Sequence, residues 1–599
     1  MKMLKRLTAL ALTAVMLVSA AGCSGDAEPV QRGESAASGP AATQGGSGDT
    51  GKSTQSKSEP IELVVYSQLA NYSGEQQGWS AKLLLDKFNV KLTIIPDSDG
   101  VFDTRMEAGK LGDIVVFGST GNDYKRAVKN GMLLDWNKYD LLNNHGQYIR
   151  DNMSTALQSN RNLTNTITEG ASDALYGFGH SVALSADSHE QFFYTWDIRW
   201  DLYKSLGYPV VKGLDDLVTL FEQMKSICPT DENGNPTYAV SLWPDWDGNM
   251  VMYVKAFTTA FWGYDEFQLG VYDPDTGIMH DALEKDGPYL TSLKFFNTLY
   301  QKGLLDPNSM SQTYTEMIEK LKVGGVFFSI FNYAGSLAYN TDTHMQDGKY
   351  MYTMVPQDAV PLCYGMSPYG GNRVWTIGAN TEHPELCMDI INWLCTPDGY
   401  MEVLYGPKDV TWYYDSDGRA CLTDFGQKCL NDKENTIMTK EEAGIYEGGT
   451  FHDGELQINN TTWSGNEINP NTTGDTYDMT YWRSVVSKTD YDVQRDWIAY
   501  TGAETAGEYM DKLNYRVAPP TEYNEAEMDD DFELIWKQVT TCIVDYSWKA
   551  IYASSDGEFN YLVQQMMSTA KAYGYDQCKQ WSFDEAAKRH ALEEAFRGN

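Results

Sequence analysis

Runs of apolar residues that suit strands alternate with helix-like runs from Ile61 onward. The strand-like runs are short and almost continuously apolar, as in strands buried on both faces of a parallel sheet. The intervening runs repeat their apolar positions with a helical period, and the last of them is stopped by Gly131. Strands are predicted at 61–66, 90–95 and 112–117, and helices at 79–87, 102–108 and 123–130. This alternation predicts an open α/β layer architecture.

The pattern restarts after Tyr176-Gly177 and runs to the C-terminus without an internal repeat. Turn-forming residues between the elements support a hairpin around the Asp273–Gly277 turn. Strands are predicted at 192–196 and 326–330, and helices at 197–206, 214–224, 289–302 and from 384 to 394. From about Glu525 onward the chain is predicted to be mostly helical.

The N-terminus has the pattern of a secretory signal. Three basic residues precede an uncharged run, 7–21, that is too short to cross a bilayer and stay there. The residues leading to Cys23 resemble the bacterial lipobox, with Ala20 where Leu is usual. We therefore expect a lipoprotein signal peptide at 1–22 and a diacylglyceryl group on Cys23, which would anchor the protein to the membrane. An ordinary signal peptide followed by an incidental cysteine is the alternative.

Residues 23–60 are rich in Gly, Ser, Ala, Thr and Gln and contain almost no apolar side chains, so they are expected to form a flexible tether. The remaining chain, 61–599, is far longer than a domain of ~100–150 residues, and at least two cores are expected. No later apolar run approaches the ~20 residues that span a membrane.

The composition argues against several kinds of site. A formal net charge of −37 repels phosphate backbones, so nucleic-acid binding is not expected. The eight cysteines after Cys23 form no CxxC pair and are expected to be free and buried, with a Cys421–Cys429 disulfide as the alternative. The eight histidines are scattered, and we expect no cofactor and no metal centre. One segment is weakly similar to a calcium-binding loop, through Asp273, Asp275, Gly277 and Glu284. We interpret this segment as a plain hairpin turn.

Several segments, in order and over nearly all of 61–599, resemble one family. They are 113–116 with 131–135, 194–207, 299–307, 324–328, 381–394 and 405–418. Together they are similar to family 1 extracellular solute-binding proteins, the lipoprotein components of bacterial ABC carbohydrate importers. The last segment and the helical tail resemble the larger members from Gram-positive bacteria.

The resemblance implies a fold, a place and partners. The fold would be α/β, with two periplasmic-binding-protein-like lobes joined by a hinge and a mostly helical C-terminal extension. Lobe one would comprise 61–180 and 326–366, and lobe two 181–325 and 367–599. The protein would be a monomer, not an enzyme, held at the outer face of the cytoplasmic membrane. It would bind a carbohydrate, as an oligosaccharide in an inter-lobe cleft, and deliver it to an ABC transporter permease.

Candidate ligand-binding residues follow from the chemistry of sugars. Ligands of open α/β sheets lie beyond the carboxyl ends of the strands. Sugars need aromatic platforms with planar polar groups beside them, and the chain has 16 Trp and 39 Tyr. The candidates near predicted strand ends are Tyr66, Gln68, Phe117, Ser119, Trp196, Arg199, Trp243, Trp246, Asp247, Trp262, Asn332, Tyr333, Asn372, Arg373 and Trp375.

The loop 370–375 is the favoured candidate, because its glycines permit close backbone approach and Arg373 offers a forked donor to hydroxyls or a carboxylate.

Two other functions stay open. An extracellular glycoside hydrolase would use two carboxylates ~5–9.5 Å apart. Alternatively, the same fold would bind a peptide or another polar solute.

Overall fold

The protein is described by a computed structural model that covers residues 59–98, 100–486, 491–526 and 528–597. The expected signal peptide at 1–22, the acylated Cys23 and almost all of the expected tether at 23–60 lie outside these residues. Those three expectations stay predictions.

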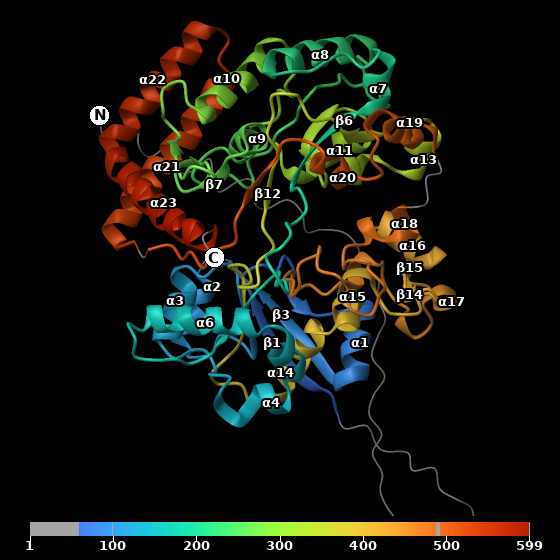
Figure 1. Ribbon diagram of the computed structural model, residues 1–599, viewed down its shortest axis with the longest axis vertical. Helices are drawn as coiled ribbons and strands as arrows, with labels where there is room; N and C mark the ends of the chain where they lie inside the picture. Colours follow the sequence, from blue (N-terminus) through green and yellow to red (C-terminus); the bar gives the residue numbers. More distant parts are fainter. Residues whose placement is uncertain (1–58, 99, 487–490, 527, 598–599) are drawn as a thin grey trace, which may run out of the picture. The chain divides into compact units, whose positions relative to one another are not determined.

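The first sheet has six strands in the order β2-β3-β1-β4-β13-β5, of which β1 and β3 are labelled in Figure 1. Strands β3, β1 and β4 are parallel, whereas β13 runs antiparallel to β4 and β5. The strands are β1 (Ile61–Ser67), β2 (Gly74–Glu75), β3 (Val90–Pro96), β4 (Ile114–Phe117), β5 (Gly177–Gly179) and β13 (Val374–Ile377). The strands expected at 61–66, 90–95 and 112–117 are confirmed.

Apolar residues on both faces of this sheet build the first core. In β4, Ile114 and Val116 join one hydrophobic cluster, while Val115 and Phe117 join another. Because successive side chains of a strand point to opposite faces, this double burial explains the continuous apolar run. The helices of this part are α1 (Gly78–Phe88), α2 (Val101–Glu107), α3 (Asn122–Lys129), α4 (Leu141–Asn144), α5 (Gln147–Asn152), α6 (Ser154–Ile167), α14 (Pro384–Cys395) and α15 (Pro397–Tyr405).

The second core surrounds β6 (Tyr194–Arg199), the central strand of a three-stranded antiparallel sheet. Its neighbours are β10 (Phe328–Phe331) and β11 (Met351–Thr353). The expected hairpin is confirmed and belongs to a second small sheet of β7 (Asp265–Phe267), β8 (Gly270–Tyr272) and β9 (Met279–Asp281). The helices are α7 (Trp200–Ser205), α8 (Leu214–Ile227), α9 (Met252–Trp262), α10 (Pro288–Gln301), α11 (Tyr314–Lys322), α12 (Ser336–Tyr339) and α13 (Asp342–Gln346).

Strand pairing differs in two places from the expected division of the chain. The segment 326–366, expected in lobe one, contributes β10 and β11 to the sheet of β6. The segment 367–599, expected in lobe two, contributes β13 to the six-stranded sheet. The reason is that a short apolar strand has the same appearance in either sheet, so local pattern does not identify its distant partner.

The expected helical C-terminal part is confirmed as α21 (Asp530–Ile551), α22 (Asp556–Tyr573) and α23 (Tyr575–Arg597), coloured red in Figure 1. Helix α21 begins where Asp529 accepts a hydrogen bond from the Phe532 N–H. Before these helices, β16 (Arg516–Ala518) pairs in parallel with β12 (Leu362–Tyr364).

A buried arginine fastens α23 to the β7–β9 sheet. The Arg589 guanidinium lies 2.7 Å from an Asp265 carboxylate oxygen and 2.8 Å from one of Glu593. It also stands over the Tyr272 ring, 4.7 Å from its centroid. Burial alone would lower the pKa of Arg589, but the two carboxylates raise it above its usual range. The arginine is therefore charged and paired with two carboxylates.

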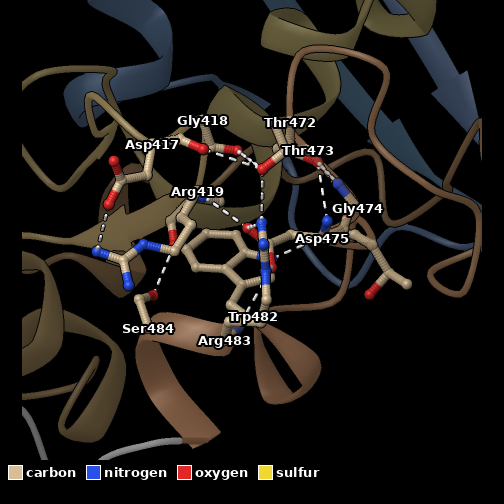
Figure 2. Close-up of polar contacts among 12 residues, drawn as sticks. Asp417, Gly418, Arg419, Thr472, Thr473, Gly474, Asp475, Trp482, Arg483 and Ser484 are labelled. Carbon is tan, nitrogen blue, oxygen red and sulfur yellow. Dashed lines mark hydrogen bonds and ion pairs between the residues drawn. The ribbon is translucent and has the colours of Figure 1, made fainter.

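A second polar cluster holds the loops that follow α15. Figure 2 shows the Arg483 guanidinium against Asp475, whose side chain is almost fully buried. Asp475 also accepts the backbone N–H of Ala420, so it joins 472–484 to a short hairpin. The elements of this part and of the chain up to β16 are β14 (Trp412–Tyr414), β15 (Ala420–Leu422), α16 (Asp424–Asn431), α17 (Lys440–Ala443), α18 (Arg483–Val486), α19 (Asp492–Thr501) and α20 (Ala506–Asp511).

In the part of the chain that the structure covers, no helix has both the length and the apolarity needed to cross a membrane. The eight cysteines after Cys23 are free, and seven of them are buried. Cys421 and Cys429 therefore form no disulfide with each other.

Candidate functional site

The ends of three adjacent strands form one edge of the six-stranded sheet. The carboxyl ends of β1 and β4 lie here, together with the start of the antiparallel β13. Gln68, which follows β1, is bonded to the segment that follows β4. Its Nε2 donates to Asp123 (2.8 Å) and its Oε1 accepts the Gly118 N–H (2.9 Å). Ser119 is exposed beside them and accepts the Gly121 N–H. This edge is where ligands of α/β sheets bind.

The start of β13 adds a cation to this edge. Asn372 and Arg373 are exposed, and the Arg373 backbone N–H points to Nδ1 of His180 at 3.2 Å. Burial, helped by the positive charge of Arg373, lowers the pKa of His180 to about 4. His180 is therefore neutral at physiological pH, which leaves Arg373 as the charged group.

A loop at 458–461 crosses the same edge. Ser67 Oγ donates to the Ile458 carbonyl (2.8 Å), and the Trp375 indole donates to the Thr461 carbonyl (2.7 Å). Asn459 adds a third bond, from its Nδ2 to the Leu69 carbonyl at 3.1 Å. The loop is thus tied to β1 and to β13, and it is held in a defined position.

Around the second core, four aromatic side chains lie together and reach the surface; we call them the aromatic face. They are Phe193, Trp246, Tyr314 and Tyr333. Trp246 is 48% exposed and Phe193 is 51% exposed, whereas the two tyrosines are half-buried. The Trp246 ring centroid lies 4.7 Å from that of Tyr314 and 6.2 Å from that of Tyr333. Exposed aromatic surface of this kind is what a sugar ring needs for stacking.

The face is supported from below and bordered by polar groups. Phe331 stacks under Tyr333 at 5.0 Å, and Trp243 contacts Trp246 edge-on at 5.4 Å. At the border, Asp245 accepts the backbone N–H of Tyr314 at 2.7 Å. Asn332 lies next to Tyr333 in sequence and is half-buried. The rings are therefore fixed before any ligand arrives.

Six of the fifteen predicted residues lie inside the cores and are unavailable to a ligand in this structure. They are Tyr66, Phe117, Trp196, Arg199, Trp243 and Trp375. Tyr66 donates to Asp97, and the Arg199 guanidinium pairs with Asp201 and stands over Tyr339. A large aromatic at a strand end can turn inward as easily as outward. Residue type alone therefore did not separate the buried candidates from those at the surface.

The other nine residues fall into three groups. Gln68, Ser119, Asn372 and Arg373 lie at the strand edge. Trp246, Asn332 and Tyr333 lie at or beside the aromatic face. Asp247 and Trp262 belong to neither group: Asp247 accepts the Trp548 indole N–H at 2.6 Å, and Trp262 ends α9 against Phe261.

Two members of the aromatic face, Phe193 and Tyr314, were missed by the sequence reasoning. Tyr314 opens α11, whose start is marked by a capping box between Thr313 and Glu316. Phe193 immediately precedes β6. A search for aromatics at or next to the first residue of an element would have found both.

Among the described residues, no cluster of histidine, cysteine and acidic side chains could hold a metal ion. In the hairpin that faintly resembled a calcium loop, Asp273 and Asp275 pair with Arg516, at 3.2 and 3.1 Å. Glu284 pairs with His280.

A family model described as "Bacterial extracellular solute-binding protein" matches residues 86–406, more than half of the chain. The chain belongs to this family. The family binds solutes and is not one of enzymes, so the resemblance inferred from sequence is confirmed. A search of curated proteins finds no match.

Solved structures agree with the fold. An alginate-binding protein, AlgQ2, is 16% identical, with a TM-score of 0.56 over 88% of this chain and 98% of that one. An extracellular solute-binding protein from Bifidobacterium longum subsp. infantis is 13% identical, with a TM-score of 0.55 over 89% and 99%. The substrate-binding protein FusA of an S. pneumoniae ABC transporter, solved with kestose, is 15% identical, with a TM-score of 0.54 over 90% and 100%. The expected α/β, periplasmic-binding-protein-like fold is thereby confirmed.

Proposed function

We propose that this extracellular solute-binding protein captures an oligosaccharide and delivers it to the permease of an ABC transporter. The observation that carries the proposal is the aromatic face, where Phe193 and Trp246 are each about half exposed. Isolated exposed apolar side chains need no explanation, but a contiguous group of aromatic rings marks a binding surface. The structural relatives named for alginate binding and for a kestose complex support a carbohydrate as the ligand.

The ligand is proposed to contact two lobes that correspond to the two hydrophobic cores. Lobe one would contain 61–180 and 367–486, and lobe two 190–360 and 491–597, in accordance with the strand pairing. Gln68, Asn372 and Arg373 would contribute hydrogen bonds from lobe one, and Trp246 and Tyr333 would contribute stacking from lobe two.

Such a ligand drives closure only through its preference for the closed form. To change a 1:99 population of closed protein into 99:1, this preference must reach about 5.5 kcal/mol. Stacking on Trp246 and Tyr333 together with bidentate hydrogen bonds to Arg373 is of this order. The closed form is the one proposed to dock on the permease.

The protein is further proposed to be held at the outer face of the membrane by a diacylglyceryl group on Cys23. The basic residues, the apolar run and the small residues before Cys23 support this proposal. Mass spectrometry of the protein from bacterial membranes tests it: Cys23 should carry the lipid at a new N-terminus. Release of a Cys23→Ala variant into the medium is the matching result, and unchanged membrane retention would contradict it.

A thermal-shift screen of the full-length chain against neutral and acidic glycans, with peptides as a separate arm, tests the ligand class. The glycan that raises the melting temperature should bind the Trp246→Ala variant roughly 30-fold more weakly, because truncating an anchoring aromatic costs about 2 kcal/mol. Tyr561→Ala is the control, since Tyr561 is 63% exposed but lies on α22. Stabilisation by peptides alone, or equal glycan affinity of the two variants, would reject the carbohydrate site.

A further inference from the structure

The loop that carries Tyr333 is held from beneath by a buried aspartate. Residues 332–335 connect β10 to α12, and Tyr333 is the member of the aromatic face that lies on this loop. Directly after the loop, the backbone N–H of Ser336 donates to the carboxylate of Asp197 at 2.7 Å. Asp197 belongs to β6 and is 2% exposed. The central strand of the second core is therefore bonded to the loop through one carboxylate.

The contact between the loop and this carboxylate is too close for a side chain at Gly335. A Cβ at this position would lie 2.7 Å from Asp197 Oδ2 and 2.7 Å from the Phe331 carbonyl oxygen. The loop also closes on itself, because the Asn332 carbonyl accepts the N–H groups of Gly335 and Leu337, each at 3.0 Å. Residues 332–337 thus form a tight turn, and the bond to Asp197 fixes this turn to β6.

Strand β6 has a β-bulge immediately before Asp197. Two of its residues, Thr195 and Trp196, lie opposite the single residue Ile330 of β10. Trp196 is completely buried, yet its φ of 52° lies in the left-handed region that a tryptophan rarely adopts. Bulges redirect nearby side chains, and backbone strain of this kind persists only where the surrounding structure enforces it. Asp197 follows the bulge directly, so the bulge sets the direction of its carboxylate.

The N–H groups beside the bulge on β10 have partners of their own. The Ile330 N–H donates to the Tyr253 hydroxyl at 3.2 Å, and the Phe331 N–H donates to Ser329 Oγ at 3.1 Å. The Tyr253 ring also packs edge-on against Phe331 and Trp243, in each case with 5.5 Å between ring centroids. Phe331 and Trp243 are the rings that support the aromatic face from below. The bulge and the aromatic face therefore rest on the same side chains.

Stability alone gives no reason for a carboxylate at this position. Asp197 is bonded to a backbone N–H rather than to a cation, and burial raises its pKa although the hydrogen bonds from Ser336 oppose the rise. A neutral side chain would cost less free energy to bury. A carboxylate does, however, accept a shorter hydrogen bond that is roughly twice as strong as that of a neutral acceptor. What the charge contributes is a firmer hold on the loop.

We propose that Asp197 is a positioning residue for ligand binding: it fixes the 332–335 loop so that Tyr333 lies beside Trp246 in the aromatic face. Asp197 is buried and acts only through the loop. The ligand-binding part of this inference rests on the proposed function, whereas the effect of Asp197 on the loop does not.

Two variants and two readouts without ligand test this role. Asp197→Leu removes the acceptor, and Asp197→Asn keeps an oxygen that can accept the Ser336 N–H. The full-length chain is labelled with ¹⁵N in Trp, and Trp246→Phe assigns the Trp246 indole signal. We expect Asp197→Leu to shift this signal and to speed hydrogen–deuterium exchange of 332–340 by roughly tenfold or more, because a buried hydrogen bond is lost. Asp197→Asn should stay within about threefold of the wild type, since the bond is kept.

The same indole signal reports binding. Maltotetraose, mannotetraose, nystose and lacto-N-tetraose are titrated separately into the wild type and both variants. A glycan that shifts the Trp246 signal of the wild type should bind Asp197→Leu roughly tenfold more weakly, because the loop no longer holds Tyr333 in place. Asp197→Asn should restore most of the affinity.

Asp475→Leu is the matched control. Asp475 is also a buried aspartate that accepts a backbone N–H, that of Ala420, but it belongs to the cluster that follows α15. This variant should lower the melting temperature and leave both readouts unchanged. If Asp197→Leu does not fold, Gly335→Ala disturbs the same contact from the loop side and should shift both readouts.

The outcomes that overturn the inference are specific. They are an Asp197→Leu variant with unchanged readouts, an Asp197→Asn variant as perturbed as Asp197→Leu, an equal response to Asp475→Leu, and a glycan that binds Asp197→Leu as tightly as the wild type. Failure of all four tetrasaccharides to bind the wild type would instead count against the proposed function, and the two ligand-free readouts would still decide the role of Asp197.

Discussion

Replacing Arg589 by Met should detach α23 from the β7–β9 sheet. The methionine keeps most of the apolar stem but removes the guanidinium between Asp265 and Glu593. Those two side chains are 8% and 0% exposed, so both carboxylates would remain buried without a cation. Breaking a buried ion pair by removing one partner costs about 3–5 kcal/mol.

Hydrogen–deuterium exchange of 575–597 measures this loss locally, which suits a large protein whose global unfolding need not be two-state. A loss of about 3–5 kcal/mol corresponds to roughly 150- to 5,000-fold faster exchange. Lys512→Met is the control, because the Lys512–Glu508 pair is exposed and contributes less than ~1 kcal/mol.

A companion variant checks the cause. Replacing Asp265 by Asn and Glu593 by Gln together with Arg589→Met should restore part of the protection, since the amides carry no charge and their oxygens still accept from Tyr364 and Tyr272. Exchange of Arg589→Met within about threefold of the wild type would refute the reasoning, and so would a triple variant that is less protected than the single one.

Two further predictions concern the first core. The pKa of His180 falls from 6.5 to about 4 on folding, so stability should be complete above pH ~6.5 and should decline, by up to about 3 kcal/mol, as pH drops to ~4. Urea titrations should show a flatter profile for His180→Gln, and an unchanged slope over this range would contradict the assignment. Asp475→Asn should cost about 1–3 kcal/mol, because it weakens the buried acceptor of Arg483 and Ala420. Asp417→Asn, at an exposed carboxylate, should change the urea midpoint little, and equal effects of the two substitutions would be the contrary result.

Local patterns were sufficient to predict most individual elements. The parallel strands β1, β3 and β4, the β8–β9 hairpin and the helical C-terminus follow from runs of fewer than about twenty residues. Partners at long range were harder to assign. Val374 of β13 pairs with Phe117, and nothing in the loop-like sequence Gly370–Arg373 identifies that partner. The same limit led 326–366 to be placed with the wrong sheet.

Residue type did not separate the candidate aromatics that reach the surface from those that are buried. Trp246 and Tyr333 do lie together, but Trp196 and Trp375 are buried. Burial depends on whether a side chain lies on the inner or outer face at its position, and a reversal by one residue in a strand exchanges the two. Tyr314 reaches the aromatic face only because α11 begins there, which is a feature of tertiary structure.

The connectivity of the six-stranded sheet determines the order in which its contacts can form during synthesis. Its central strands come from the first 120 residues, yet β13 and the loop bonded to Ser67 arrive only at 374–377 and 458–461. Contacts so distant in sequence form slowly, because a long segment must be confined before they contribute. Until 374–377 and 458–461 are available, the strands from the first third of the chain lack β13 and the loop that Ser67 bonds.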